Sequence, residues 1–327
     1  MDANAIKRRA LLGVGGIALV LPTLVYGQSY PGKPIRLVHG FGAGSSIDVV
    51  ARLIGQKLSE ALGQPVIVES RPGATGTIAN EFVVNSPADG YTLLIAPLAA
   101  VITASHLYPV RYNSLKDLTP VVQVAYFDTV LVAGPSVPAK NVRDLITFAK
   151  SRAEPVTYAS PGSGTGFHLA GELLSQTAGI KLLHVPYRGG GTSALTDVMG
   201  GRVDLTFESL GPVLPHLQSG RLHALAVTGT SRSSVLPDIP TMAECGLTGY
   251  EVTGWHGVFA PAATPSAITR QLHGAVTAIL SATDMQQRWA AINLKFISMS
   301  PEDFAKKVGA DDQRYRKLIK DRGIQAD

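Results

Sequence analysis

The feature that most constrains the fold is a strand, a glycine-rich turn and a helix that follow one another in residues 35–62. Residues 35–39 are mostly apolar, and residues 40–46 contain three glycines and two serines. Apolar side chains then recur at helical spacing from position 47, and Gly63 and Pro65 follow where a helix would end. This order predicts a buried strand that leads through a flexible loop into an amphipathic helix.

The start of that helix has the features of an anion site. Ser45 and Asp48 have the spacing of a capping box, which predicts that the helix begins there. The first-turn amides of such a helix point outward, and the helix dipole favours negative charge. We interpret the loop as half of a binding site for a small carboxylate. Asp48 either caps its own helix or orients a ligand amine or a water.

Composition places the chain among globular proteins. Its 327 residues are enough for two domains, and 45% are hydrophobic while only 16% are charged. The net charge of +5 is mild, and no basic run lies outside the N-terminus, which argues against a nucleic-acid partner. The single cysteine, Cys245, cannot form an intramolecular disulfide, and we expect a small residue that is buried or partly buried.

The N-terminus has the pattern of an export signal. Lys7, Arg8 and Arg9 precede an apolar run at positions 10–25, and a cleavage site is plausible before Gln28. We therefore predict that residues 1–27 are a cleaved signal peptide of the general secretory or twin-arginine type, and that the mature protein is periplasmic. The alternative is an uncleaved anchor helix, although the apolar run is short for a membrane span.

Strands and helices alternate through the first part of the chain. Further strands are predicted at residues 65–69 and 91–95, each followed by a turn and a helical stretch. Such alternation predicts an α/β fold with a covered, mostly parallel sheet. Because ligands bind at the carboxyl ends of parallel strands, the loops at 40–46, 71–76 and 97–100 should share one edge. Thr75, Gly76 and Leu98 are therefore candidate ligand contacts.

The opening plan recurs later in the chain. A strand at 155–159, a glycine-rich turn at 160–166 and a helix at 167–178 repeat the first unit. Further turns bring Tyr187, Arg188 and Gly189, and then Glu208 and Ser209, to strand ends. We predict domain 1 from residues 28–127 and 251–327 and domain 2 from residues 128–250. Two crossings between domains make a hinge that can close over a solute.

Enzyme alternatives rest on partial motifs. Gly40 and Gly42 after a strand suggest a dinucleotide fold with Glu69 as the ribose-binding acid, but Ser45 stands in place of the third glycine. A hydrolase would use Ser163, but no Gly-Lys-Ser/Thr or nucleophile elbow is present in this turn. His168 and Glu172 are spaced for a metal without a third ligand nearby. We expect no cofactor and no metal.

Several short motifs in order resemble one family. They are YPGKPI at 30–35, the loop at 41–48, RPGA at 71–74, PADGYTLL at 87–94, HVPYRG at 184–189, LPDIPT at 236–241 and FAPA at 259–262. Together they resemble the Bug/TctC extracytoplasmic solute receptors of tripartite tricarboxylate transporters. The resemblance implies a two-domain, type II periplasmic-binding-protein fold, a small carboxylate ligand and membrane permease subunits as partners. A receptor that instead signals to a sensor kinase would have the same sequence features.

In this family two loops grip a ligand carboxylate, and they correspond here to residues 41–46 and 160–166. The first loop differs from the usual pattern, because His39 and Gly40 precede Phe41 and Ser45 follows Gly44. The candidate ligand-binding residues are Phe41, Gly42, Ala43, Gly44, Ser45, Ser46, Asp48, Thr75, Gly76, Leu98, Ser160, Gly162, Gly164, Thr165, Gly166, His168, Tyr187, Arg188, Gly189, Glu208 and Ser209.

Overall fold

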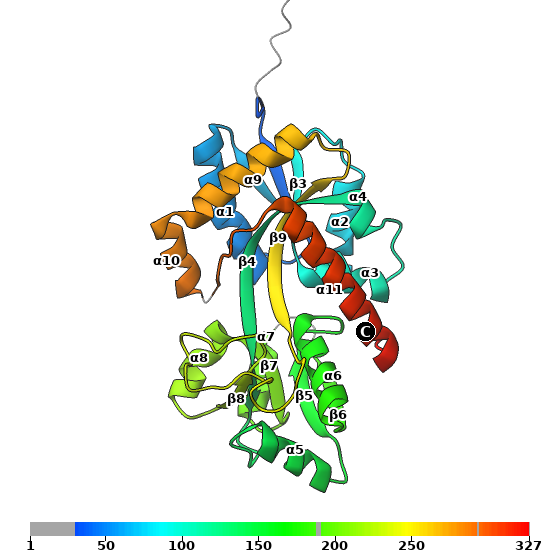
Figure 1. Ribbon diagram of the computed structural model, residues 1–327, viewed down its shortest axis with the longest axis vertical. Helices are drawn as coiled ribbons and strands as arrows, with labels where there is room; N and C mark the ends of the chain where they lie inside the picture. Colours follow the sequence, from blue (N-terminus) through cyan, green and yellow to red (C-terminus); the bar gives the residue numbers. More distant parts are fainter. Residues whose placement is uncertain (1–29, 188–190, 293, 327) are drawn as a thin grey trace, which may run out of the picture.

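The computed structural model describes residues 30–187, 191–292 and 294–326, so the predicted signal peptide lies outside the described residues. The chain forms two lobes, one above the other, joined by two long strands (Figure 1). The long strands are β4 (Leu118–Ala133) and β9 (Thr253–Pro261).

Lobe 1 is built from the first and last parts of the chain. Its elements are β1 (Ile35–His39), α1 (Ser46–Leu62), β2 (Val66–Ser70), the 3-10 turn η1 (Ala74–Gly76), α2 (Thr77–Val84), β3 (Thr92–Pro97), the π-helical turn η2 (Ala99–Thr103), α3 (Ala104–Leu107), α4 (Ser114–Asp117), α9 (Ser266–Ser281), α10 (Thr283–Ala291) and α11 (Pro301–Arg322). The strands β1, β2 and β3 are parallel neighbours. The predicted α/β alternation is confirmed here.

Lobe 2 repeats the parallel arrangement. Its elements are α5 (Val142–Ser151), β5 (Val156–Ser160), α6 (Gly166–Ala178), β6 (Leu182–Pro186), α7 (Gly191–Met199), β7 (Leu205–Ser209), α8 (Leu210–Gln218) and β8 (His223–Val227). The strand β5 lies parallel to β6 and to β7, while β8 pairs antiparallel to β4. The carboxyl ends of β5, β6 and β7 therefore lie at one edge of this lobe.

One sheet runs through both lobes in the order β2-β1-β3-β9-β4-β7-β5-β6. From Leu118 to Asp128 the strand β4 pairs with β9, and from Thr129 to Ala133 it pairs with β7 and β8. The strand β4 continues past residue 127, where the first segment of domain 1 is predicted to end. Asp128 and Thr129 interrupt the apolar pattern, yet both are buried and hydrogen-bonded, Asp128 to Lys295 at 3.1 Å.

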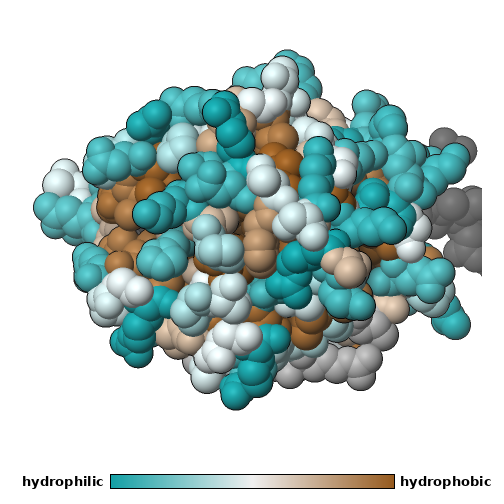
Figure 2. Space-filling model, turned by 90° about the horizontal axis from the view of Figure 1, so that it is seen from below, coloured by the Kyte–Doolittle hydropathy of each residue, from teal (hydrophilic) through white to brown (hydrophobic). Residues whose placement is uncertain are grey.

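The hydrophobic cores lie between the sheet and its helices. The predicted apolar face of α1 is confirmed for Ile47, Val50, Ala51, Ile54 and Leu58, which are all buried, whereas Ala61 in the last turn, predicted on the same face, is exposed. The end of the molecule formed by lobe 2 is covered mostly by hydrophilic side chains, with smaller apolar patches between them (Figure 2). In the described part of the chain, no helix combines the length and the apolar character needed to cross a membrane.

Candidate functional site

Three loops of lobe 1 meet at the carboxyl ends of β1, β2 and β3. Gly40 lies against Gly76 so closely that a Cβ on Gly40 would come within 2.4 Å of the Gly76 Cα. Gly76 has φ +94, and a Cβ there would lie 2.8 Å from the Cβ of Ala100. The hydroxyl of Ser70 donates to the carbonyl of Phe41 at 2.6 Å. The predicted shared edge is confirmed, and only glycine permits this approach at positions 40 and 76.

The first turn of α1 is not capped by a side chain. Ser45 is the N-cap residue, but its hydroxyl donates to the carbonyl of Gly42 at 2.7 Å. The predicted capping box is therefore wrong, because the Ser45 hydroxyl accepts from no amide at the start of α1, and the Asp48 carboxylate accepts from the amide of Gly44 instead of that of Ser45. Among the hydrogen bonds of the described residues, none is donated by the backbone amides of Ser46, Ile47 and Asp48. These amides are the donors that an anion at this terminus would use.

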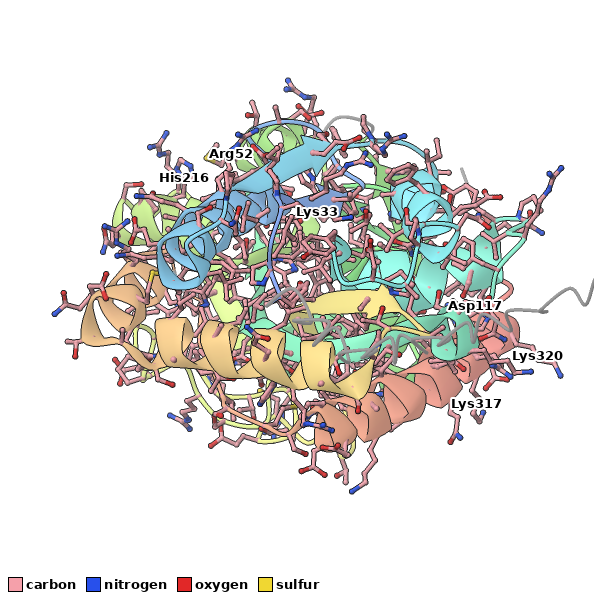
Figure 3. All side chains as sticks on the ribbon, turned by 90° about the horizontal axis from the view of Figure 1, so that it is seen from above. Lys33, Arg52, Asp117, His216, Lys317 and Lys320 are labelled. Carbon is pink, nitrogen blue, oxygen red and sulfur yellow. The ribbon has the colours of Figure 1, made fainter. Side chains whose placement is uncertain are left out.

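Asp48 holds the loop from inside. Its carboxylate accepts from the amide of Gly44 at 2.9 Å and from the guanidinium of Arg52 at 3.0 Å, and it lies 3.1 Å from Nε2 of His39. The bond from Arg52, followed by that from Gly44, lowers the pKa of Asp48 to about 2. Arg52 itself lies on the outer side of α1 (Figure 3). The amide of Gly44 is thus occupied, and Asp48 shapes the loop.

His39 lies fully buried beneath this loop. Because Asp48 is ionised, its oxygens only accept, so Nε2 of His39 carries the hydrogen. Burial lowers the pKa of His39, against the neighbouring carboxylate of Asp48, which raises it. Within the described residues, Nδ1 of His39 has no hydrogen-bond partner. In the sequence, His39 stands out only as a departure from the family pattern, although a polar residue at the end of an apolar strand is a signal of a functional position.

The corresponding loop of lobe 2 follows β5. Ser160 is fully buried, and its Oγ lies 2.6 Å from Nε2 of His184 and 3.1 Å from the carbonyl of Gly162. The hydroxyl of Thr165 accepts from the amide of His168 at 3.3 Å and donates to Gly162 at 2.8 Å. The helix α6 is therefore capped by the side chain of Thr165. Ser160 is buried and stabilises the loop from within.

The helix α6 carries a buried polar network directly behind the loop. The amide of Gly164 donates to Nδ1 of His168 at 3.0 Å, and His168 stacks on His184 with ring centroids 3.8 Å apart. Glu172 accepts from the hydroxyl of Tyr158 at 2.8 Å and from Arg322 at 2.8 Å. His168 is only 5% exposed, so its ring lies within this network. Within the described ranges, no group of three or more His, Cys, Asp or Glu could hold a metal ion.

Other predicted residues line the same edges or support them. Thr75 has φ 53 and lies next to Gly76, whereas Leu98 is only 5% exposed and belongs to the core. The amide of Tyr187 donates to Ser160 at 2.9 Å, and its hydroxyl donates to Asp197 at 2.6 Å. Burial, followed by the bond to Asp197, raises the pKa of Tyr187 to about 12.

Two candidates are the last residues of β7. The carboxylate of Glu208 accepts from the amide and the hydroxyl of Ser209 at 2.8 Å and 3.0 Å. Glu208 is 6% exposed, and burial raises the pKa of its carboxyl. Arg188 and Gly189 lie outside the described residues.

A surface depression of about 610 Å³ is lined by Arg36, Phe82 and neighbouring residues, and by none of the loop residues.

The two lobes touch at the second loop. The hydroxyl of Thr103 in η2 donates to the carbonyl of Gly164 at 2.6 Å, and both residues are buried. A Cβ on Gly164 would come within 2.1 Å of Cδ1 of Leu107, which belongs to α3 of lobe 1. Thr103 and Leu107 could not be recognised from the sequence, because they lie in a helical stretch with no motif of its own. The second loop, at the edge of lobe 2, is therefore in direct contact with η2 and α3 of lobe 1.

Sequence comparison finds known relatives over most of the chain. A sequence model described as "Tripartite tricarboxylate transporter family receptor" (TctC) matches residues 50–324. A relative from Pseudomonas sp. (strain P51), the "UPF0065 protein in tcbD-tcbE intergenic region", is 35% identical over 97% of this chain and 95% of its own length.

Solved structures extend the likeness to the whole fold. R. palustris Rpa4515 with adipate is 34% identical with a TM-score of 0.80, over 90% of this chain and 99% of that chain. MatC from Rhodopseudomonas palustris with bound malate is 29% identical with a TM-score of 0.77, over 89% of this chain and 100% of that chain.

The predicted flytrap fold is confirmed by these neighbours and by the structure of the periplasmic binding protein BugD, which is 32% identical with a TM-score of 0.77, over 90% of this chain and 99% of that chain. The nucleotide-linked and hydrolase alternatives are thereby set aside. The chain belongs to the tripartite tricarboxylate transporter receptor family, TctC, and is an extracytoplasmic solute receptor.

Proposed function

We propose that this receptor captures a small carboxylate between its lobes and delivers it to the membrane permease subunits of a tripartite tricarboxylate-type transporter. The family description supports the transporter. Two neighbours hold adipate and malate, both dicarboxylates, which supports the ligand class. We also propose that residues 1–27 direct export to the periplasm, and that residues 128–250 form the domain that moves against the rest.

The observation that carries this proposal is the uncapped start of α1. The amides of Ser46, Ile47 and Asp48 are donors without a partner among the described residues, while Gly42, Ala43 and Gly44 beside them are exposed. A carboxylate at this point would accept hydrogen bonds from several amides and interact with the positive end of the helix dipole. Charge-assisted bonds of this kind are stronger than neutral ones.

The ligand class is tested by calorimetric titration of the full mature protein with adipate, malate and uncharged adipamide. A receptor of this type should bind at least one of the acids, and the diamide much more weakly, because the amide cluster selects for charge. Stabilisation against heat should then rise with the logarithm of acid concentration above saturation. If a nucleotide stabilises the protein and no acid does so, the proposed ligand class is wrong.

The position of the carboxylate is tested by Ser46→Pro. Position 46 is the first residue of α1, where proline fits a helix, and Ser45 has the extended conformation that a following proline requires. The substitution removes one amide donor and should weaken acid binding about tenfold with little change in stability. Gly166→Pro makes the same change at the first residue of α6, where a Cβ meets nothing within 4 Å.

Ser266→Pro, at the first residue of α9, is the matched control and should leave affinity unchanged. We expect a smaller loss from Gly166→Pro than from Ser46→Pro, since α6 is already capped by Thr165. Full affinity in Ser46→Pro would mean that the carboxylate does not lie at the start of α1.

A further inference from the structure

The hydroxyl of Thr103 connects the two lobes at the second loop. Thr103 is fully buried, and its Oγ1 lies 2.6 Å from the carbonyl oxygen of Gly164. Thr103 ends η2 in lobe 1, whereas Gly164 lies in the loop between β5 and α6 in lobe 2. The bond therefore exists only while the lobes are in contact.

The same hydroxyl has a second acceptor within its own element. Oγ1 of Thr103 also lies 3.0 Å from the carbonyl of Ala99, four residues earlier. A threonine hydroxyl in a helix commonly donates to this carbonyl. When the lobes separate, the hydroxyl can donate fully to Ala99, and the carbonyl of Gly164 can bond to water. Breaking the contact therefore leaves no buried hydroxyl without an acceptor, which makes the bond reversible.

Gly164 is the point at which the second loop is held in place. Its carbonyl accepts from Thr103, its amide donates to Nδ1 of His168, and its Cα faces Leu107. With φ +76 it is in the left-handed region, which glycine adopts readily. Of these contacts, the hydrogen bond to the Gly164 carbonyl is the one whose donor, Thr103, belongs to lobe 1. The orientation of this peptide group thus depends on whether the lobes are closed.

We propose that Thr103 is a positioning residue that fixes the second loop when the lobes close. The inference rests on the proposed function, because closure over a solute is what gives the bond its role. Since the bond forms only in the closed arrangement, it slows ligand release and leaves ligand association nearly unchanged. The lobes are also joined elsewhere, where α11 reaches down towards α6 (Figure 1). There the guanidinium of Arg322 in α11 donates to the hydroxyl of Ser175 in α6 at 2.9 Å.

The test compares Thr103→Val, which removes the hydroxyl at nearly constant shape, with Thr103→Ser, which keeps it. Adipate dissociation is measured by stopped flow, and hydrogen exchange of residues 160–166 is measured both with adipate and without it. Thr103→Val should raise the dissociation rate of adipate about fivefold, as expected for the loss of one hydrogen bond, and should speed hydrogen exchange in residues 160–166. Thr103→Ser should behave as the unsubstituted protein does.

Thr269→Val is the matched control, because this buried hydroxyl donates to Ser266 within lobe 1 and should change neither readout. Unchanged dissociation and unchanged exchange in Thr103→Val would overturn the inference, as would equal effects in Thr103→Ser. If adipate does not bind the unsubstituted protein, the ligand proposal loses support, and the exchange measurement alone decides on Thr103.

Discussion

The two glycine-rich loops have nearly the same backbone and different surroundings. In each, a glycine with positive φ donates its amide to a side chain four residues later, Gly44 to Asp48 and Gly164 to His168. In each, the N-cap hydroxyl donates to a glycine carbonyl three residues earlier. In both loops the amide of this glycine is therefore already hydrogen-bonded, so an anion would have to accept from the amides at the start of the helix.

The difference lies in what covers each loop. Gly42, Ala43 and Gly44 are exposed, whereas Gly164 is buried against Thr103 and Leu107 of the other lobe. The start of α1 has no side-chain cap in the described structure, while Thr165 caps α6. The comparison teaches that one backbone pattern can serve two tasks: the second loop takes part in the contact between lobes, while we propose that the first loop offers donors to a solute.

The largest effect should come from Gly40→Ala, which tests how rigidly the first loop is built. The new Cβ would meet the backbone of Gly76 at 2.4 Å, and two packed backbones of one lobe cannot easily move apart. We expect a loss of about 2–3 kcal/mol in the free energy of unfolding, as for overpacked sites. Gly42→Ala is the control, since its Cβ meets nothing within 4 Å. Equal stabilities in urea denaturation would contradict this account of the loop.

The charge beneath the first loop gives a smaller, pH-dependent effect. The pKa of Asp48 is lowered to about 2 by Arg52 and then by the amide of Gly44. A carboxyl with a lowered pKa stabilises the folded state above its unfolded pKa of about 4, and this stabilisation is lost as the pH falls towards 2. Asp48→Asn should therefore be less stable than the unsubstituted protein at pH 7, by about 1–2 kcal/mol.

The two unfolding curves of Asp48→Asn and the unsubstituted protein should converge as the pH is lowered from about 4 to about 2. The exposed carboxyl of Asp238 offers a control in Asp238→Asn, which should show no such convergence. A constant difference between pH 7 and pH 2 would mean that charge on Asp48 does not hold the loop. The second loop uses an imidazole nitrogen in the same place, so it lacks this carboxylate dependence.

Much of this arrangement could be predicted from the sequence, and what was missed has a physical reason. Local patterns predicted β1, α1 and both glycine-rich loops, because apolar spacing and glycine report on a few neighbouring residues. The capping box failed at Ser45, because the spacing of Ser45 and Asp48 does not determine which amide each side chain accepts from, and Asp48 accepts from Gly44 instead. Thr103 was missed because its partner is 61 residues away, and an apolar helical stretch gives no sign of a contact across lobes.

The smallest effect concerns the two N-cap residues and tests whether the helices differ as their hydrogen bonds indicate. Thr165→Ala removes a hydroxyl that accepts from the amide of His168, so the free energy of unfolding should fall by about 1 kcal/mol. Ser45→Ala removes a hydroxyl that caps no amide in the described structure and should change stability by only a few tenths of that. Both values come from urea denaturation at pH 7. If Ser45→Ala proves as destabilising as Thr165→Ala, then Ser45 does cap α1, its amides are not free for a solute, and the division of tasks between the loops fails.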